Sequence, residues 1–223
     1  MKPIFLMIVL FFAFPNALSA QQSPSRDLFL QYESGNTTAG QPGAKLMVEL
    51  NREGKTRVVS PDTKFQSGDR VRFHLSLNFD GYLAVLNRGT SGKLNCLYPY
   101  QGAPNPVHAS SELMVPGHEA WFEFDQTPGT EEVTFLMSKG LIAELQGLAG
   151  SAAKGEGNAE GEMQTTSNAA ANQQAPLDKL NARASEASRD LHLQMAGDAS
   201  YGTTSEQDLS GLVKFTVFLK HVN

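Results

Sequence analysis

The chain has 223 residues, and its 18 Lys and Arg residues against 23 Asp and Glu residues give a formal net charge of −5. A mildly acidic chain without a Lys/Arg cluster gains nothing from neutralising phosphates, which argues against nucleic acid and against an anionic membrane surface as partners. The length is sufficient for one well-packed core. The only cysteine is Cys96, far from the start of the chain, which excludes lipid attachment at a cysteine that begins the mature protein.

Residues 1–20 have the pattern of a secretory signal peptide. Lys2 precedes an apolar run from Ile4 to Phe14, and small residues follow a Pro-Asn break. The apolar run is shorter than the stretch of about 20 residues that a membrane-spanning helix needs. We expect cleavage after Ala20, or alternatively after Ser19, and export of the mature chain to the periplasm or the medium of a bacterium, without stable membrane insertion.

The segment before the first long strand is polar. We interpret residues 21–43 as a flexible leader with one short strand at Leu28–Tyr32. From Lys45 to Val59 two apolar stretches flank Glu53-Gly54, which predicts a β-hairpin with its turn at these two residues.

The stretch from Ser67 to Pro99 predicts three strands joined by two tight turns. Every second residue of the first strand is apolar, which predicts one buried face and one solvated face. The second strand, Tyr82–Leu86, is apolar at nearly every position and needs cover on both faces. We expect Asp80-Gly81 to form a tight hairpin turn between them, because glycine adopts a positive φ. The apolar residues of the first strand are Val71, Phe73, Leu75 and Leu77.

The third strand of this stretch, Lys93–Tyr98, follows a turn that contains Gly92 and ends at Pro99, which has no N–H group for a sheet. Residues 100–111 are rich in turn formers and predict a long exposed loop. Two further strands are expected at Ala120–Phe124 and Glu132–Ser138, with a Pro128-Gly129 turn between them. Residues 141–148 have the leucine spacing of a short helix.

The last third of the chain changes composition twice. Residues 147–175 have no aromatic residue and few branched ones, which predicts a disordered linker. Residues 176–195 have an apolar stripe with a period of 3.6 and predict an amphipathic helix that covers part of a sheet face. We expect a loop at residues 196–208 and, at residues 209–223, an apolar closing strand inserted into the sheet.

These elements predict an all-β fold. About seven or eight short strands with regularly spaced turns are typical of an antiparallel β-sandwich, immunoglobulin-like or jelly-roll-like. We expect residues 44–146 to form its core, which the closing strand completes.

Several short motifs follow one another along the chain: Phe65, Gly68 and Asp69; Asp80, Gly81, Tyr82 and Leu83; Gly92; Leu97, Tyr98 and Pro99; Pro116; and Pro128, Gly129 and Glu131. In this order the motifs resemble the bacterial domain of unknown function 4384 family. They begin with a Phe-x-x-Gly-Asp element and end with a Pro-Gly-x-Glu turn. The resemblance implies a β-sandwich module of exported bacterial proteins, often appended to peptidase or signalling domains, with no agreed activity. The long Ala/Gly/Asn-rich insertion departs from the family pattern.

The sequence contains no recognisable catalytic or metal-binding motif. The five histidines, at positions 74, 108, 118, 192 and 221, are spread without a His-x-His or His-Glu-x-x-His pair, so we expect no metal or other cofactor. A lone thiol such as Cys96 more often packs as a small apolar residue than acts as a nucleophile, the alternative being an intermolecular disulfide. Tyr82, Tyr98, Tyr100 and Trp121 are residue types that can line a sugar-binding face, but we favour the interpretation that Tyr82 and Tyr98 are core residues.

The function that these observations favour is non-catalytic binding of a protein or cell-envelope component. Loops on a rigid sandwich are a common recognition surface, and we expect contacts from Tyr100, His108 and Trp121. Two alternatives stay open: an envelope structural protein that assembles through its closing strand or insertion, and a hydrolase whose site would show a concave cluster of acidic and histidine side chains.

Overall fold

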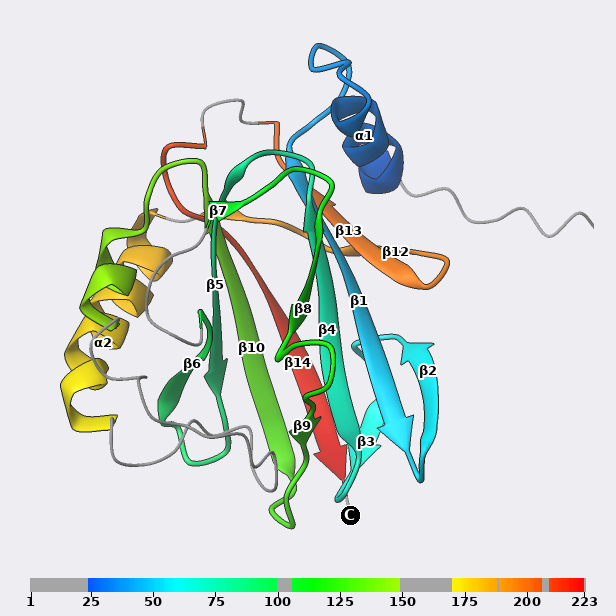
Figure 1. The fold of residues 1–223 in the computed structure, drawn as a ribbon, viewed down its shortest axis with the longest axis vertical. Coiled ribbons are helices and arrows are strands. Elements are labelled where there is room, and N and C mark those ends of the chain that lie inside the picture. Colours follow the sequence, from blue (N-terminus) through cyan, green and yellow to red (C-terminus); the bar gives the residue numbers. More distant parts are fainter. Residues whose placement is uncertain (1–23, 100–105, 149–169, 188, 206–208, 223) are drawn as a thin grey trace, which may run out of the picture.

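Two β-sheets pack face to face around one apolar core (Figure 1). The computed structural model describes residues 24–99, 106–148, 170–187, 189–205 and 209–222. The expected signal peptide lies outside these residues, as does Tyr100. No helix among them is both long enough and apolar enough to span a membrane.

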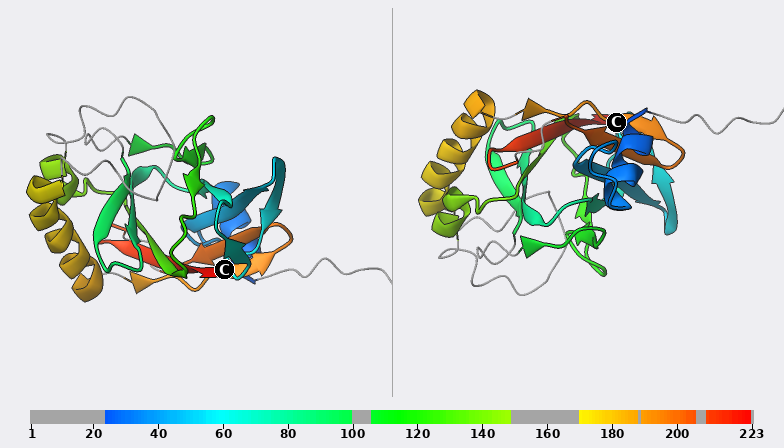
Figure 2. Two further views of the ribbon diagram at one scale, coloured as in Figure 1. Left: turned by 90° about the horizontal axis from the view of Figure 1, so that it is seen from below. Right: turned by 90° about the horizontal axis from the view of Figure 1, so that it is seen from above.

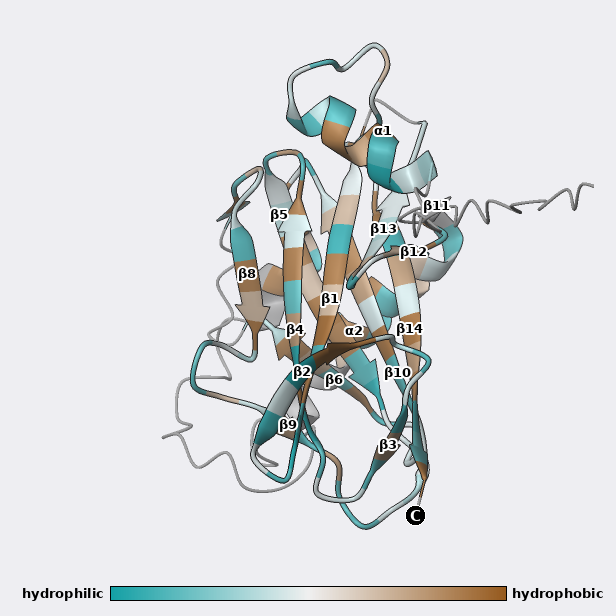
Figure 3. Ribbon diagram, turned by 90° about the vertical axis from the view of Figure 1, so that its right-hand side faces the viewer, coloured by the Kyte–Doolittle hydropathy of each residue, from teal (hydrophilic) through white to brown (hydrophobic). Residues whose placement is uncertain are grey.

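The first sheet, sheet I, is built on the long pair β1–β4. These strands are antiparallel, with Leu46 opposite Leu75 and Val48 opposite Phe73. Apolar and polar residues alternate along β4, as its coloured ribbon shows (Figure 3). Sheet I has the order β12-β13-β1-β4-β8, with β2 beside β1 and β9 beside β4. Its strands are β1 (Gly43–Arg52), β2 (Lys55–Val59), β4 (Arg70–Leu77), β8 (Glu112–Val115), β9 (Phe122–Glu123), β12 (Gln194–Ala196) and β13 (Ala199–Thr203).

The second sheet, sheet II, has the order β11-β14-β10-β5-β6, with β3 beside β14 and β7 beside β5. The closing strand β14 is antiparallel to β10 over nine residue pairs, and it pairs in parallel with β3 and β11. The C-terminal strand is thus inserted into the sheet, where the sequence predicts it. The strands of sheet II are β3 (Lys64–Gln66), β5 (Gly81–Arg88), β6 (Leu94–Tyr98), β7 (Pro106–Val107), β10 (Gly129–Ser138), β11 (Arg189–Asp190) and β14 (Val213–Val222).

The core lies where the inward rows of the two sheets meet. Phe73 of sheet I contacts Phe135 edge-on, with ring centroids 5.5 Å apart, and Phe135 stacks on Phe215 at 4.6 Å. All three rings are fully buried, and burial of each stabilises the fold by roughly 2 kcal/mol. The chain is therefore mostly β, with two packed sheets, which confirms the predicted fold class at this level.

A helical layer covers the outer face of sheet II (Figure 2). Helix α2 (Ala170–Ala187) and the 3₁₀ turn η1 (Ala143–Leu148) bury Leu177, Leu180 and Leu145 against β5, β6 and β10. The helix begins before the predicted residue 176 and ends before the predicted residue 195. It ends early because residues 189–190 pair with β14, which carries Leu191 into the core between the sheets.

Three other expectations about the flanking segments are wrong. The short strand expected at residues 28–32 belongs to helix α1 (Pro24–Glu33), which begins with a proline and buries Phe29 against Tyr201. The loop expected at residues 196–208 contains β13, which pairs with β1. The exposed loop expected at residues 100–111 contains the two-residue strand β7, which pairs with β5. Strand β8, which follows this loop and pairs with β4, was not expected either, because its alternation is short.

The connection between β4 and β5 also differs from the expected hairpin, because the two strands belong to different sheets. Gly81 has no positive φ. It is required for a close approach instead, since a Cβ atom there would lie 2.6 Å from the carbonyl oxygen of Ser138. Asp80 accepts a hydrogen bond from the Ala109 N–H at 2.9 Å.

Candidate functional site

The inward rows of sheet II change from apolar to polar at one end of the sandwich. Strand residues two apart share a face, so each change can be traced along its own row. Leu83 and Val85 are followed by Asn87, and Val217 and Leu219 are followed by His221. Strands β10 and β6, the antiparallel partners of β5, show the same change from apolar to polar residues. In β10 the inward row has Glu131 next to Val133, and in β6 it has Asn95 next to Leu97.

These polar residues border a pocket of about 380 Å³. The β5–β6 turn and the segment from Glu123 to Thr127 complete its wall, with Phe124 as its aromatic residue. This volume lies near the lower end of the range for small-ligand sites. The pocket is therefore large enough for one small molecule or one side chain of a partner.

Glu131 is positioned by two contacts with the β5 end. The Asn87 side-chain amide donates a hydrogen bond to Glu131 Oε2 at 2.9 Å. A Cβ atom at Gly89 would lie only 3.0 Å from the same oxygen, so the absence of a side chain there leaves room for the carboxylate. Thr90 lies directly over Gly129, where a Cβ atom would meet its Cγ2 at 1.9 Å. The turn and the start of β10 are thus fitted to each other.

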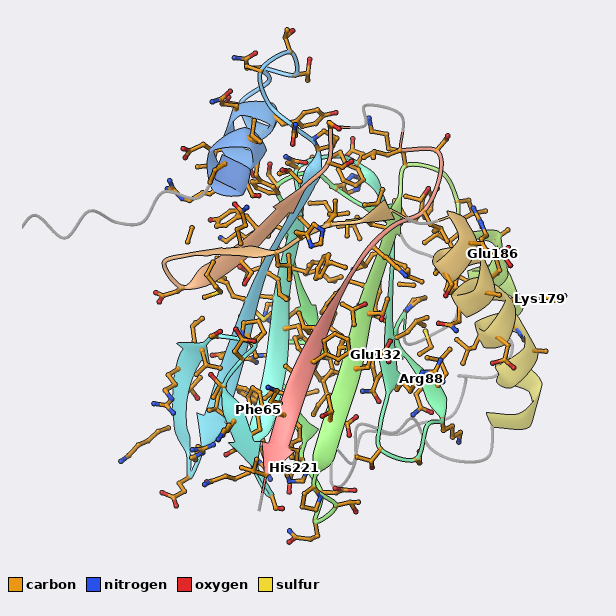
Figure 4. The ribbon with its side chains drawn as sticks, turned by 180° about the vertical axis from the view of Figure 1, so that it is seen from behind. Phe65, Arg88, Glu132, Lys179, Glu186 and His221 are labelled. Carbon is orange, nitrogen blue, oxygen red and sulfur yellow. The ribbon has the colours of Figure 1, made fainter. Side chains whose placement is uncertain are left out.

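His221 holds the floor of the pocket together. Its Nδ1–H donates to the Thr127 carbonyl at 3.0 Å, and its Nε2 accepts from the Ser67 hydroxyl at 3.1 Å. The ring contacts Phe124 at 5.2 Å between centroids, and Phe124 stacks on Phe65 at 4.9 Å. Figure 4 shows His221 and Phe65 near each other at this end of the sandwich. Both ring nitrogens of His221 are therefore occupied by structural hydrogen bonds.

Asn95 is the exception among these polar groups. Asn95 is only 9% exposed, and its side-chain amide has no hydrogen-bond partner among the residues that the structure describes. A buried amide without a partner destabilises the fold by roughly 1–3 kcal/mol. Because Asn95 lines the pocket, an occupant of the pocket is the natural partner for this amide.

The pocket lining is acidic. Glu123, Asp125 and Glu131 contribute carboxylates, and none of the lining residues is Lys or Arg. Arg70, outside the pocket, pairs with Glu123 at 2.8 Å, while Asp125 accepts from the Thr127 N–H at 2.6 Å. Within the described ranges, no three His, Cys, Asp or Glu side chains form a group that could hold a metal ion.

A second polar cluster lies on the outer face of sheet I. Glu49 accepts hydrogen bonds from Arg72 at 2.7 Å and from His74 at 2.8 Å, and the other ring nitrogen of His74 lies 3.0 Å from Glu112. Burial alone would raise the pKa of Glu49, but the hydrogen bonds and charges of His74 and Arg72 outweigh it and lower that pKa. Trp121 belongs to this cluster, because the Arg72 guanidinium lies over its ring at 4.1 Å.

The two described residues of the expected contact surface are not brought together. His108 is exposed, with Nδ1 3.5 Å from Asp80 Oδ1, beyond the C-terminal end of β4. Trp121 lies beside Arg72, near the start of the same strand. Five strand positions, from Arg72 to Leu77, correspond to a rise of about 17 Å. Tyr100 lies outside the described residues.

Cys96 lies in the apolar layer beneath α2, where burial raises the pKa of its thiol to about 12. The sequence places Cys96 and Tyr98 in one row, but a β-bulge between Val85 and Leu86 separates them. Tyr98 therefore belongs to the core between the sheets. Cys96 donates a hydrogen bond to the Tyr98 carbonyl at 3.1 Å.

The motif residues Gly68 and Asp69 lie at the end of the sandwich that carries the pocket, whereas Gly81 and Tyr82 begin β5 at the opposite end. Gly68, at φ +84°, makes the turn into β4, and its N–H donates to the Phe124 carbonyl at 2.8 Å. Asp69 is buried and accepts from the Gln66 N–H at 2.8 Å and from Arg52. The Gly68 contact fixes the segment that carries Phe124, and Phe124 forms part of the pocket wall. These motif residues therefore contribute to the shape of the pocket without lining it.

Two packed sheets with a polar, ligand-sized pocket at one end define this chain as a small β-domain with a candidate binding site. The family model described as "Domain of unknown function (DUF4384)" matches residues 64–140, which confirms the resemblance inferred from the sequence for that segment. No curated protein and no solved structure matches the chain. The matched segment supplies Asn87, Asn95 and Glu131, whereas His221 comes from the closing strand outside it.

Proposed function

We propose that this chain is an exported, non-catalytic β-sandwich module, immunoglobulin-like or jelly-roll-like, that binds a protein or cell-envelope component in its polar end pocket. The observation that carries the proposal is the buried Asn95 amide, which faces the pocket without a partner among the described residues. For the stability of the fold alone, an apolar residue would be more favourable at this position, as at Leu97 in the same row, because a buried polar group without a hydrogen bond is destabilising. An amide there is explained by a ligand that completes its hydrogen bonds.

The family match adds support of a general kind, since it covers ten of the eleven residues that line the pocket and carries no assigned activity. The outer-face cluster around Glu49 is a weaker candidate for binding. Its charged groups already satisfy one another, so a ligand would have to displace existing hydrogen bonds.

Site-specific photocrosslinking in the native host tests this proposal. A photoreactive residue at Ser91, an exposed residue of the pocket wall, should crosslink to a defined partner or envelope polymer. The matched control is the same residue at Arg57, exposed on β2. Crosslinking from position 91 that Asn95→Leu abolishes would support the proposal. Equal products from both positions, or none from position 91, would overturn it.

A hydrolase is the second candidate, because Glu123, Asp125, Glu131 and His221 share one concavity. The hydrogen bonds of His221 weigh against it, since neither ring nitrogen is free to move a proton on a substrate. Hydrolysis of envelope polymers or peptides that Glu131→Gln abolishes, in a variant with an unchanged melting temperature, would favour this candidate instead.

A further inference from the structure

The pocket has an excess of negative charge that no described group balances. Arg70 pairs with Glu123, but Asp125 and Glu131 form no ion pair with any described residue. An anionic ligand about 4 Å from one such carboxylate would be repelled by roughly 4 kcal/mol at the effective dielectric of a protein surface. The occupant is therefore neutral or cationic.

The pocket also offers several unused hydrogen-bond acceptors. Glu131 has two oxygens, and Asn87 occupies only one of them with a single donor. Asp125 has one oxygen bonded to Thr127, and Asn95 contributes a free carbonyl oxygen. Ammonium and guanidinium groups donate three and five hydrogen bonds and accept none, which complements this arrangement.

Size distinguishes an organic cation from a metal ion. The described carboxylates and His221 do not gather into a metal-binding group, and a pocket of about 380 Å³ is much larger than one bare ion. Phe124 gives the wall an aromatic element against which an aliphatic stem or a guanidinium plane can pack.

Resting on the proposed binding function, we infer that the pocket receives a basic side chain, the ammonium of a lysine or the guanidinium of an arginine, presented by the partner. Glu131 is the counter-charge, Asp125 a second acceptor, and the Asn95 carbonyl oxygen the third. Asn87 and Gly89 act on the ligand through Glu131, as positioning residues.

The test uses ligand-observed nuclear magnetic resonance on the full chain with four probes. They are Nα-acetylarginine amide, Nα-acetyllysine amide, the neutral analogue Nα-acetylcitrulline amide and glucose as a neutral polyol. We expect the two cations to bind, at least tenfold more tightly than citrulline or glucose, and to weaken as salt is raised.

Variants with matched charge changes complete the experiment. Glu131→Gln should weaken cation binding at least tenfold, and Asp125→Asn should weaken it while its side-chain oxygen still caps Thr127. Glu132→Gln is the control, because Glu132 lies on the outer face beside Arg88 (Figure 4). A melting temperature within a few degrees of the original shows that each variant folds.

The outcomes separate this inference from the function on which it rests. Equal binding of citrulline and arginine, equal effects of Glu131→Gln and Glu132→Gln, or no cation binding at a probe concentration of about 20 mM, well above the millimolar range of weak sites, would overturn the cation inference. If crosslinking from position 91 persisted in any of these cases, the pocket would still be the binding site, for a neutral ligand.

Discussion

The guanidinium of Arg52 donates a hydrogen bond to each carboxylate oxygen of Asp69, from Nε to Oδ1 at 2.7 Å and from Nη2 to Oδ2 at 2.5 Å. Asp69 is 2% exposed and lies in the turn before β4, whereas Arg52 lies at the end of β1. The pair ties the β1–β2 hairpin to the turn that positions Phe124. The Asp69 hydrogen bond is also the main reason why the pKa of Arg52 is raised.

Asp69→Asn should therefore lower the free energy of unfolding by about 3 kcal/mol, because it removes one partner of a largely buried ion pair. Urea denaturation monitored by circular dichroism measures this change. Glu132→Gln breaks the more exposed pair with Arg88, whose atoms are 3.9 Å apart, and should change stability by less than about 1 kcal/mol. Equal losses in the two variants would contradict the structural role of Asp69.

Gly129→Ala should destabilise the fold by about 2 kcal/mol, because the new methyl group would overlap Thr90 Cγ2. Thr90→Ser removes that methyl carbon and should recover most of the loss in the double variant. Thermal unfolding of the two single variants and the double variant measures the coupling between these positions. Strict additivity would show that the turn does not pack on β10 as described.

Glu49→Gln should cost about 2 kcal/mol of stability at neutral pH, since Glu49 accepts charged hydrogen bonds from Arg72 and His74. The folded pKa of Glu49 is lowered from its ordinary value of 4.5. Its contribution is thus present above pH 4.5 and is lost as the pH falls through the folded pKa. Urea denaturation at pH 7 and pH 3 should show a gap between wild type and variant that narrows in acid. A gap independent of pH would argue against the ionised pair.

Cys96 should resist modification in the folded chain. With a thiol pKa of about 12, roughly one molecule in ten thousand carries a thiolate at pH 8, and α2 covers the sulfur. Ellman's reagent should react within minutes in 6 M guanidinium chloride and remain unreacted for hours in buffer. Rapid reaction of the native chain, or a disulfide-linked dimer on non-reducing gels, would show that the layer over Cys96 opens.

The strands that sequence periodicity could locate are those with long, regular rows. β4 alternates over eight residues, and β14 has an inward row from Val213 to Leu219, so both were predictable from the pattern alone. β8, β9 and β13 have five residues or fewer and exist because a long neighbour offers its edge. A local pattern contains no signal for that kind of pairing.

The pocket was missed for a different reason. Asn87, Glu131 and His221 each continue an apolar row with one polar residue, which in a single strand is typical of a solvent-exposed end. The pocket is indicated only when several strands show this change at the same end of the sheet. Recognising it requires knowing that the strands are neighbours with their polar ends together. The predicted end of helix α2 was wrong for a similar reason. Leu191 fits the apolar stripe of the helix in sequence, but it packs in the core between the two sheets.

Strand β14 is separated from its partner β10 by the 74 residues between Ser138 and Val213. Until β14 pairs during folding, β10 has an unpaired edge, and such edges promote association between chains. Pairing over so long a separation is also slow, so we expect a lasting, aggregation-prone intermediate during folding. A chain ending at residue 208 should form oligomers in light scattering under conditions where the full chain remains monodisperse.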